Sequence, residues 1–233
     1  EAVARRILLH APAWQGDSGR NKRIEFFVPL FGHEDPQTYR LAYLEMRRAP
    51  YAVIRRLGRV APREQYRSML ENPRYIEWRS LAILLLAQSG NPDDAKTIWA
   101  SLQSSQQFGH STNLAAWATA AIEIDGPKAI DYLDQHYCRR SDRTREEIRE
   151  VHTALSLHGG ECQTGLRDRI VEVYGRLLES HPSMAKRITR DMYDWNRSDL
   201  ADRQQAIEGA PPGNDNQDAG AMERNFSVAG STD

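Results

Sequence analysis

The sequence predicts an all-helical protein, a solenoid of about five to six antiparallel helix pairs. Turns that contain glycine recur between apolar helical stretches, at residues 32–36, 90–94, 125–127 and 158–160. Three of their glycines, Gly90, Gly126 and Gly159, are 36 and then 33 residues apart, a period typical of helix-pair repeats. The alternation of apolar and polar residues that marks β-strands is nearly absent. These observations favour stacked helices over a sheet.

The composition of the turns explains why one helix ends there and the next begins. Glycine closes a helix by adopting a left-handed conformation at its carboxyl end. Asn or Asp followed by Pro then caps and opens the next helix. The apolar run 81–87, the turn 90–94 and the apolar run 95–102 occur in this order. We therefore expect each turn to join two neighbouring helices.

The expected helices follow from the apolar spacing between the turns. Residues 2–10 are the end of a helix, and residues 11–19 form a loop in which Asp17 or Ser18 caps the next helix. Helix pairs are expected at 20–31 with 36–48, 50–59 with 62–71, 76–89 with 92–104, 112–124 with 127–138, 143–158 with 164–179, and 182–195 with 198–208. The helical i, i+3, i+4, i+7, i+8 spacing is shown by Ile170, Val173, Tyr174, Leu177 and Leu178.

Three regions are expected along the chain. Residues 1–19 hold the first helix end and its loop, and residues 20–208 form the helical repeat domain. From residue 209 the chain is rich in Pro, Gly, Asn and Asp. Such a segment cannot bury enough apolar surface to offset the entropy lost on ordering. We therefore expect residues 209–233 to be a disordered tail.

The charge of the chain is nearly balanced overall but uneven along its length. The net charge of −1 and the pI of about 6.8 argue against a wholly basic nucleic-acid binder. Residues 1–80 carry 15 Lys and Arg against 9 Asp and Glu, a net charge of +6, which leaves −7 for the remainder. No run of 18 or more apolar residues is present, so we expect no membrane span. The sequence is compatible both with an exported and with a cytoplasmic protein.

A family resemblance rests on the turns and on the helices that follow them. The expected helix pairs have an Asp-Pro or Asn-Pro-Asp turn and an alanine-rich second helix, as in Tyr-Arg-Leu-Ala-Tyr-Leu-Glu at 39–45. In these features they resemble HEAT and HEAT-like repeats over about residues 20–180. The resemblance implies a curved, right-handed solenoid that serves as a binding scaffold. Because unrelated proteins share such repeats, it indicates a fold more than a function.

No residue pattern in the chain predicts catalysis, a metal site or a cofactor. Seven histidines are scattered, and the single His-Glu pair, His33-Glu34, is too few for the di-iron site of HEAT-like hydroxylases. A glycine-rich phosphate loop, a Gly-x-Ser-x-Gly elbow and a His-Glu-x-x-His helix are all absent. We therefore expect a protein without catalytic activity.

The two cysteines, Cys138 and Cys162, suggest a disulfide or, with His136 and His158, a metal site. Helix geometry disfavours both, because a helix of about 15 residues between them spans about 22 Å. A disulfide requires Cα atoms within about 7 Å. We expect two unbonded thiols, with the disulfide and the metal site as alternatives.

Arginines supply the candidate binding surface. The residues expected to gather along one edge of the helices are Arg48, Arg55, Arg56, Arg59 and Arg63. Such a cluster produces a local positive field, which suits an acidic protein surface, a phosphate backbone or an anionic lipid surface. The alternative is a solvated face paired with neighbouring glutamates. We expect an acidic protein partner, with a HEAT-like nucleic-acid binder or DNA-repair glycosylase as the second hypothesis.

Two further groups of residues receive a structural interpretation. The carboxylates of Glu123, Asp125, Asp131 and Asp134 are interpreted as a solvated face. Four tryptophans fall at apolar positions of helices and are expected in the core, whereas Trp14 lies in a loop and is the freest of the five. Trp14 is therefore the single tryptophan of the five that leaves room for a ligand cage.

Overall fold

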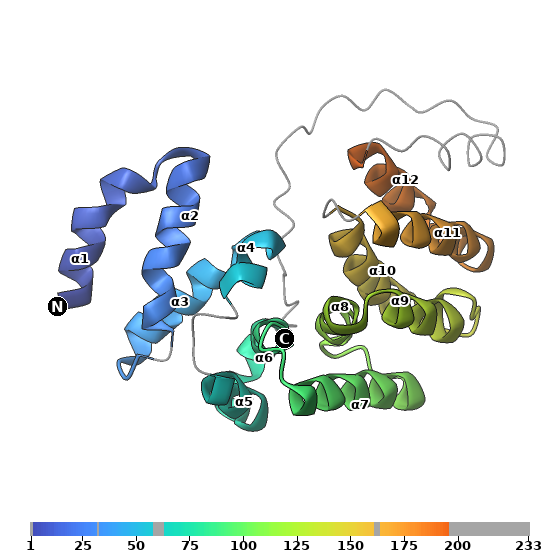
Figure 1. The fold of residues 1–233 in the computed structure, drawn as a ribbon, viewed down its shortest axis with the longest axis horizontal. Helices are drawn as coiled ribbons and strands as arrows, with labels where there is room; N and C mark the ends of the chain where they lie inside the picture. The colour runs from blue at the N-terminus through green and yellow to red at the C-terminus, as the bar shows by residue number, and fades with distance from the viewer. Residues whose placement is uncertain (1, 32, 58–62, 161–163, 196–233) are drawn as a thin grey trace, which may run out of the picture. The chain divides into compact units, whose positions relative to one another are not determined.

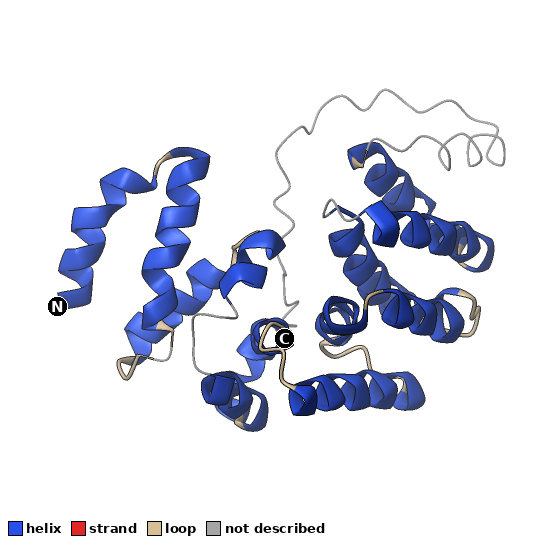
Figure 2. Cartoon of the chain, viewed as in Figure 1, coloured by secondary structure: helices blue, strands red, loops and turns tan. Residues whose placement is uncertain are grey.

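The computed structural model describes residues 2–31, 33–57, 63–160 and 164–195 of the 233-residue chain. These residues form twelve α-helices with short 3-10 and π-helical segments, and they contain no β-strand (Figures 1 and 2). The all-helical prediction is confirmed for this part of the chain. No helix in it is both long enough and apolar enough to cross a membrane. The expected helix 198–208 and the expected tail 209–233 lie outside the described residues.

The described helices divide into two compact units, one ending at Asn91 and the other beginning at Pro92. Unit 1 is built around α6 (Arg79–Ala87), whose residues from Ser80 to Ala87 are all buried. Helices α4 and α5 both pack against it. The other elements of unit 1 are α1 (Ala2–His10), η1 (Ala11–Trp14), α2 (Gly16–Phe27), η2 (Val28–Leu30), α3 (Pro36–Arg47), α4 (Tyr51–Leu57), α5 (Arg63–Glu71) and η3 (Pro73–Trp78).

Unit 2 has the alanine-rich helix α8 (Leu114–Asp125) at its centre, in contact with both α7 and α10 (Figure 1). Its alanines are buried, and small side chains let neighbouring helices approach closely. The other elements of unit 2 are α7 (Pro92–Phe108), α9 (Pro127–Leu133), η4 (Asp134–Cys138), α10 (Arg145–Gly160), α11 (Thr164–Ser180), η5 (Pro182–Met184) and α12 (Ala185–Asp194). The expected domain 20–208 thus includes parts of both units.

The turn chemistry is confirmed where Asp and Pro open a helix. Asp35 is the N-cap of α3, and its carboxylate accepts hydrogen bonds from the amide and the hydroxyl of Thr38 at 2.9 and 2.6 Å. These bonds hold the pKa of Asp35 below its ordinary value. Pro36 occupies the first turn, where its missing N–H costs nothing. Gly90 has the left-handed φ of +68° that was expected at its turn.

Two expected loops are helical instead. Residues 11–14 form η1, and α2 begins at Gly16 with Gln15 as its N-cap, so neither Asp17 nor Ser18 caps it. η1 and α2 approach each other so closely that a Cβ on Gly19 would come within 3.0 Å of the Trp14 backbone. The expected turn at 158–160 lies inside α10. There Gly159 faces the Trp195 ring, and a Cβ would lie within 3.0 Å of three ring atoms.

Candidate functional site: an aromatic pocket in unit 1

An aromatic cluster joins α3, α5 and η3 in unit 1. Trp78 is its hub, stacked on Tyr43 with ring centroids 4.4 Å apart and 3.9 Å from the centroid of Tyr39. Tyr39 and Tyr43 are one turn apart on α3 and therefore share a face. The remaining rings of the cluster are Phe31, Tyr66 and Tyr75.

A pocket of about 340 Å³ opens beside this cluster. It is lined by Pro29, Phe31, His33, Tyr39, Gln65, Ser68, Met69 and Tyr75. These residues come from the α2–α3 connection, α3, α5 and η3. Phe31, Tyr39 and Met69 are buried and make the inner wall, whereas His33 and Ser68 are exposed at the rim. We call this site the Tyr39 pocket.

Hydrogen bonds fix the polar groups of the rim. The Gln65 side-chain amide donates to the carbonyl of Phe31 at 2.6 Å, which leaves the side-chain oxygen of Gln65 as an acceptor. The Ser68 hydroxyl donates to the Gln65 carbonyl at 3.1 Å and keeps its lone pairs. His33 Nδ1 accepts the amide of Asp35 at 3.1 Å, so a neutral ring carries its proton on Nε2.

The Tyr39 hydroxyl is an unusual polar group near the pocket. Tyr39 is 7% exposed, and its hydroxyl oxygen is buried with no hydrogen-bond partner among the described residues. Burial raises the pKa of this phenol, and Tyr75 and Tyr43 raise it further, so the group stays protonated. A buried hydroxyl without a partner costs about 1–3 kcal/mol. Because its oxygen is not solvent-accessible, this hydroxyl is closed to an occupant of the pocket.

The predicted arginine cluster remains a prediction. Arg48 follows α3 and lies 4.0 Å from the Glu45 carboxylate, with an exposed side chain. Arg55 in α4 and Arg63 in α5 are half-buried, and both interact with other residues. The Arg56 side chain is not described, and Arg59 lies outside the described residues. The structure therefore places Arg48, Arg55 and Arg63 on or next to three different helices.

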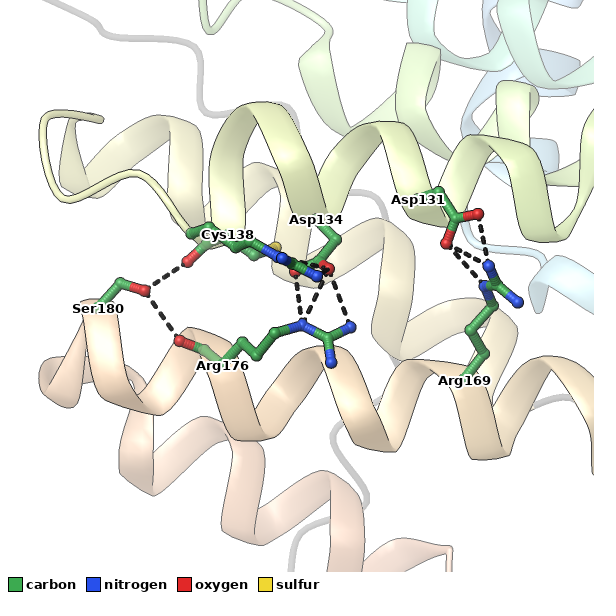
Figure 3. A network of polar contacts seen from close by, with 7 residues as sticks. Asp131, Asp134, Cys138, Arg169, Arg176 and Ser180 are labelled. Atoms are coloured by element: carbon green, nitrogen blue, oxygen red, sulfur yellow. Dashed lines mark hydrogen bonds and ion pairs between the residues drawn. The ribbon is translucent and has the colours of Figure 1, made fainter.

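The acidic residues of unit 2 are not all solvated, contrary to expectation. Asp134 is 3% exposed and accepts hydrogen bonds from Arg139, at 2.9 and 2.7 Å, and from Arg176. Figure 3 shows the Asp134 carboxylate facing Arg176, with a separate Asp131–Arg169 pair between α9 and α11. These pairs join η4 and α9 to α11. They are structural contacts and not a free acidic face.

A second buried network joins the last three helices. The Asp191 carboxylate on α12 accepts a hydrogen bond from Tyr174 at 2.7 Å and lies 3.2 Å from Nε2 of His152. Burial by itself would raise the pKa of Asp191, but the contact with His152 and hydrogen bonds from Ser156 and Tyr174 outweigh it and lower the pKa. All four residues are buried. The network therefore joins α10, α11 and α12, and the carboxylate and imidazole in it are not accessible to a substrate.

Cys138 is a buried, free thiol at the end of η4, and Cys162 lies outside the described residues. Among the residues that the structure describes, no three His, Cys, Asp or Glu side chains are grouped as metal ligands. Burial raises the pKa of the Cys138 thiol well above its ordinary range. Because the thiolate is the reactive form, the folded state protects this residue.

We predict that Cys138 does not react with iodoacetamide in the native protein and reacts fully in 6 M guanidinium chloride. Peptide mass spectrometry after each treatment measures the alkylated fraction. Two alkylated cysteines in the denatured, unreduced chain are expected as well. Rapid native labelling of Cys138 would contradict its burial.

The sequence does not indicate the pocket or its tyrosines, and it allows a tryptophan ligand cage only at Trp14. The loop expected at Trp14 is wrong, because Trp14 ends η1, is half-buried and packs on Phe26 and Phe27, with ring centroids 5.2 and 5.8 Å away. The spacing of aromatic residues at 39, 43, 75 and 78 puts two rings about one helical turn apart in each segment, but it does not show that the two segments meet.

Comparisons with known proteins identified no relative of this chain. No family model, curated protein or solved structure matches the chain. The function is therefore argued from the pocket and the charges alone.

Proposed function

We propose that this chain is a non-catalytic helical module that binds another protein and that the Tyr39 pocket receives a side chain of that partner. The observation that supports this proposal is the pocket itself, a hollow whose lining includes Phe31, Tyr39, Met69 and Tyr75. Its volume is at the lower end of the range of ligand pockets, about 300–1,000 Å³. It therefore suits one large side chain better than an extended ligand.

The residue types of the pocket support a protein partner. Tyrosine, phenylalanine and methionine are enriched in the cores of protein interfaces, where a few buried anchors supply most of the binding energy. Phe31, Tyr39, Met69 and Tyr75 belong to these types. In this proposal the helices form a right-handed, HEAT-like solenoid, an architecture whose repeats commonly build binding surfaces.

Charge supplies the second part of the proposal. The net charge of +6 over residues 1–80 favours an acidic partner surface, and Arg48, Arg55, Arg56, Arg59 and Arg63 are the residues proposed to meet it. Complementary charge of this kind speeds association more than it adds affinity. The same charge favours nucleic acid as the second candidate, although the uncharged lining of the pocket gives a phosphate no specific partner.

A selection of displayed peptides on the purified full chain tests the proposal. We expect to select peptides that bind the wild type and that bind the Ser68→Tyr variant at least tenfold more weakly, because a large side chain at the exposed rim fills the pocket. Glu71→Tyr is the matched control, since Glu71 is exposed on the same helix and does not line the pocket. It should bind like the wild type.

Duplex DNA provides the contrasting measurement in the same salt. If duplex DNA is shifted at about 150 mM salt and no selected peptide distinguishes the two variants, the nucleic-acid alternative replaces the proposal. Peptides that bind both variants equally would place the binding surface outside the pocket.

A further inference from the structure

We propose that helix α1 attaches this protein to an anionic membrane surface through its solvent-facing side. This side carries Arg5, Leu8 and Leu9, and we call it the α1 outer face. None of these three residues lines the Tyr39 pocket, so the surface is separate from the one in the proposed function. Two exposed leucines, the positive charge beside them and the order of both around the helix support the proposal.

The leucines of the α1 outer face lack cover. Helix α1 has apolar residues on two sides, and on one side Val3 and Ile7 pack against a core cluster from α2, η2 and α3. On the other side, Leu8 and Leu9 are 76% and 72% exposed. They are the two most exposed large apolar side chains among the described residues of unit 1. Adjacent exposed apolar residues, unlike scattered single ones, mark a contact surface.

The surroundings of the leucines are basic. Helix α1 and η1 contain Arg5, Arg6 and His10 and no Asp or Glu. Arg5 is exposed and has no ion-pair partner among the described residues. Helix α2 lies beside α1 (Figure 1), and residues 2–27 carry five Lys and Arg against two Asp and Glu, a net charge of +3. Basic charge of this kind attracts anionic lipid headgroups.

The order of these residues around the helix favours a bilayer over a partner helix. A helix docks along a stripe of apolar residues that are three or four positions apart. Leu8 and Leu9 are consecutive and point about 100° apart around α1, with Arg5 between them on the helix surface because it precedes them by three and four residues. A fluid lipid surface needs no matching groove and accepts both leucines, while the long Arg5 side chain reaches the headgroups.

The size of the face predicts reversible attachment. The strength with which a helix binds at the membrane interface increases with the apolar area it buries and with its attraction to anionic lipid. Two leucines supply a small apolar area, so the charges are needed as well. Salt screens such charges over about 8–10 Å. We therefore expect binding that requires anionic lipid and weakens as the salt concentration rises.

Vesicle sedimentation with the full chain tests the proposal. The probes are vesicles of phosphatidylcholine mixed with phosphatidylglycerol and vesicles of phosphatidylcholine alone. We expect the wild type to bind the mixed vesicles at least about tenfold more strongly. The double variant Leu8→Ala and Leu9→Ala should lose at least about tenfold in binding, since each methylene buried in lipid contributes roughly fourfold to partitioning. Arg5→Glu should also lose about tenfold, because it replaces an attractive charge with a repulsive one.

Helix α3 offers matched controls, because Arg40 and Leu41 are both exposed on it. Arg40→Glu makes the same change in net charge as Arg5→Glu, and Leu41→Ala truncates another exposed leucine of unit 1. Both controls should bind the mixed vesicles within about twofold of the wild type, since a charge acts only within about one screening length. The circular dichroism spectra of all variants should match that of the wild type, because the substituted side chains are exposed.

A wild type that does not bind the mixed vesicles, or binds both kinds of vesicle equally, would overturn the proposal. Equal losses in the α1 and α3 variants would also overturn it. A synthetic acidic amphipathic peptide that binds through Leu8 and Leu9, with no binding of vesicles, would assign the α1 outer face to a protein partner instead. Ser68→Tyr, which fills the Tyr39 pocket, should bind the vesicles like the wild type, so this proposal and the proposed function fail independently.

Discussion

Asp191→Ala is expected to destabilise unit 2 by about 3 kcal/mol or more. The substitution removes the acceptor for the Tyr174 hydroxyl and the partner of His152, and both side chains stay buried. Each buried polar group left without a partner costs about 1–3 kcal/mol. Urea denaturation followed by circular dichroism, with hydrogen exchange to locate the effect in α10–α12, measures the loss.

The pH dependence of stability supplies the signature of this carboxylate. Because the folded-state pKa of Asp191 is lowered, its contribution is complete above the unfolded value of about 4 and is lost as pH falls through the folded value. Asp191→Ala should lack this acidic loss. Asp194→Ala, three residues further along and exposed, is the control and should change stability by about 0.5 kcal/mol or less. Equal effects of the two variants would contradict the role given to Asp191.

Trp78→Ala is expected to destabilise unit 1 by about 3–5 kcal/mol, the usual cost of removing a buried tryptophan. Trp78 is 9% exposed, and its ring contacts Tyr39, Tyr43 and Tyr75. Since two of these rings line the pocket, peptide binding should be lost as well. Hydrogen exchange measured by mass spectrometry should show faster exchange in α3, α5 and α6.

Ile76→Ala is the control for Trp78→Ala. Ile76 belongs to the same element, η3, and is 57% exposed. Its truncation should change the free energy of unfolding by about 0.5 kcal/mol or less and leave peptide binding intact. If the two variants were equally stable, Trp78 would not be the hub of the aromatic cluster.

Local chemistry predicted the helices well, because helix ends depend on neighbouring residues. Asp35 and Pro36 open α3 through contacts within one turn, and the left-handed Gly90 lies at its expected turn. Gly159 was misread because its role depends on Trp195, 36 residues further along the chain. Asp134 was misread for the same reason, since its partner Arg176 is 42 residues away.

The pocket could not be predicted from one sequence. Tyr39, Gln65 and Tyr75 come from three separate elements, and no local pattern states that these elements meet. Apolar spacing marks each tyrosine as facing a core, which is correct for Tyr39. It does not show that a hollow remains beside the ring or that the hydroxyl lacks a partner. The all-helical class was therefore predictable, and the candidate site was not.

Methyl NMR on the full chain tests the central claim that partner binding occurs in the Tyr39 pocket. The chain has five methionines, of which Met69 lines the pocket, whereas Met184 and Met192 are buried in unit 2. With ¹³C-methyl methionine and a saturating selected peptide, we predict a large shift of the Met69 signal and unchanged Met184 and Met192 signals. Saturated binding that leaves Met69 unmoved would contradict the claim.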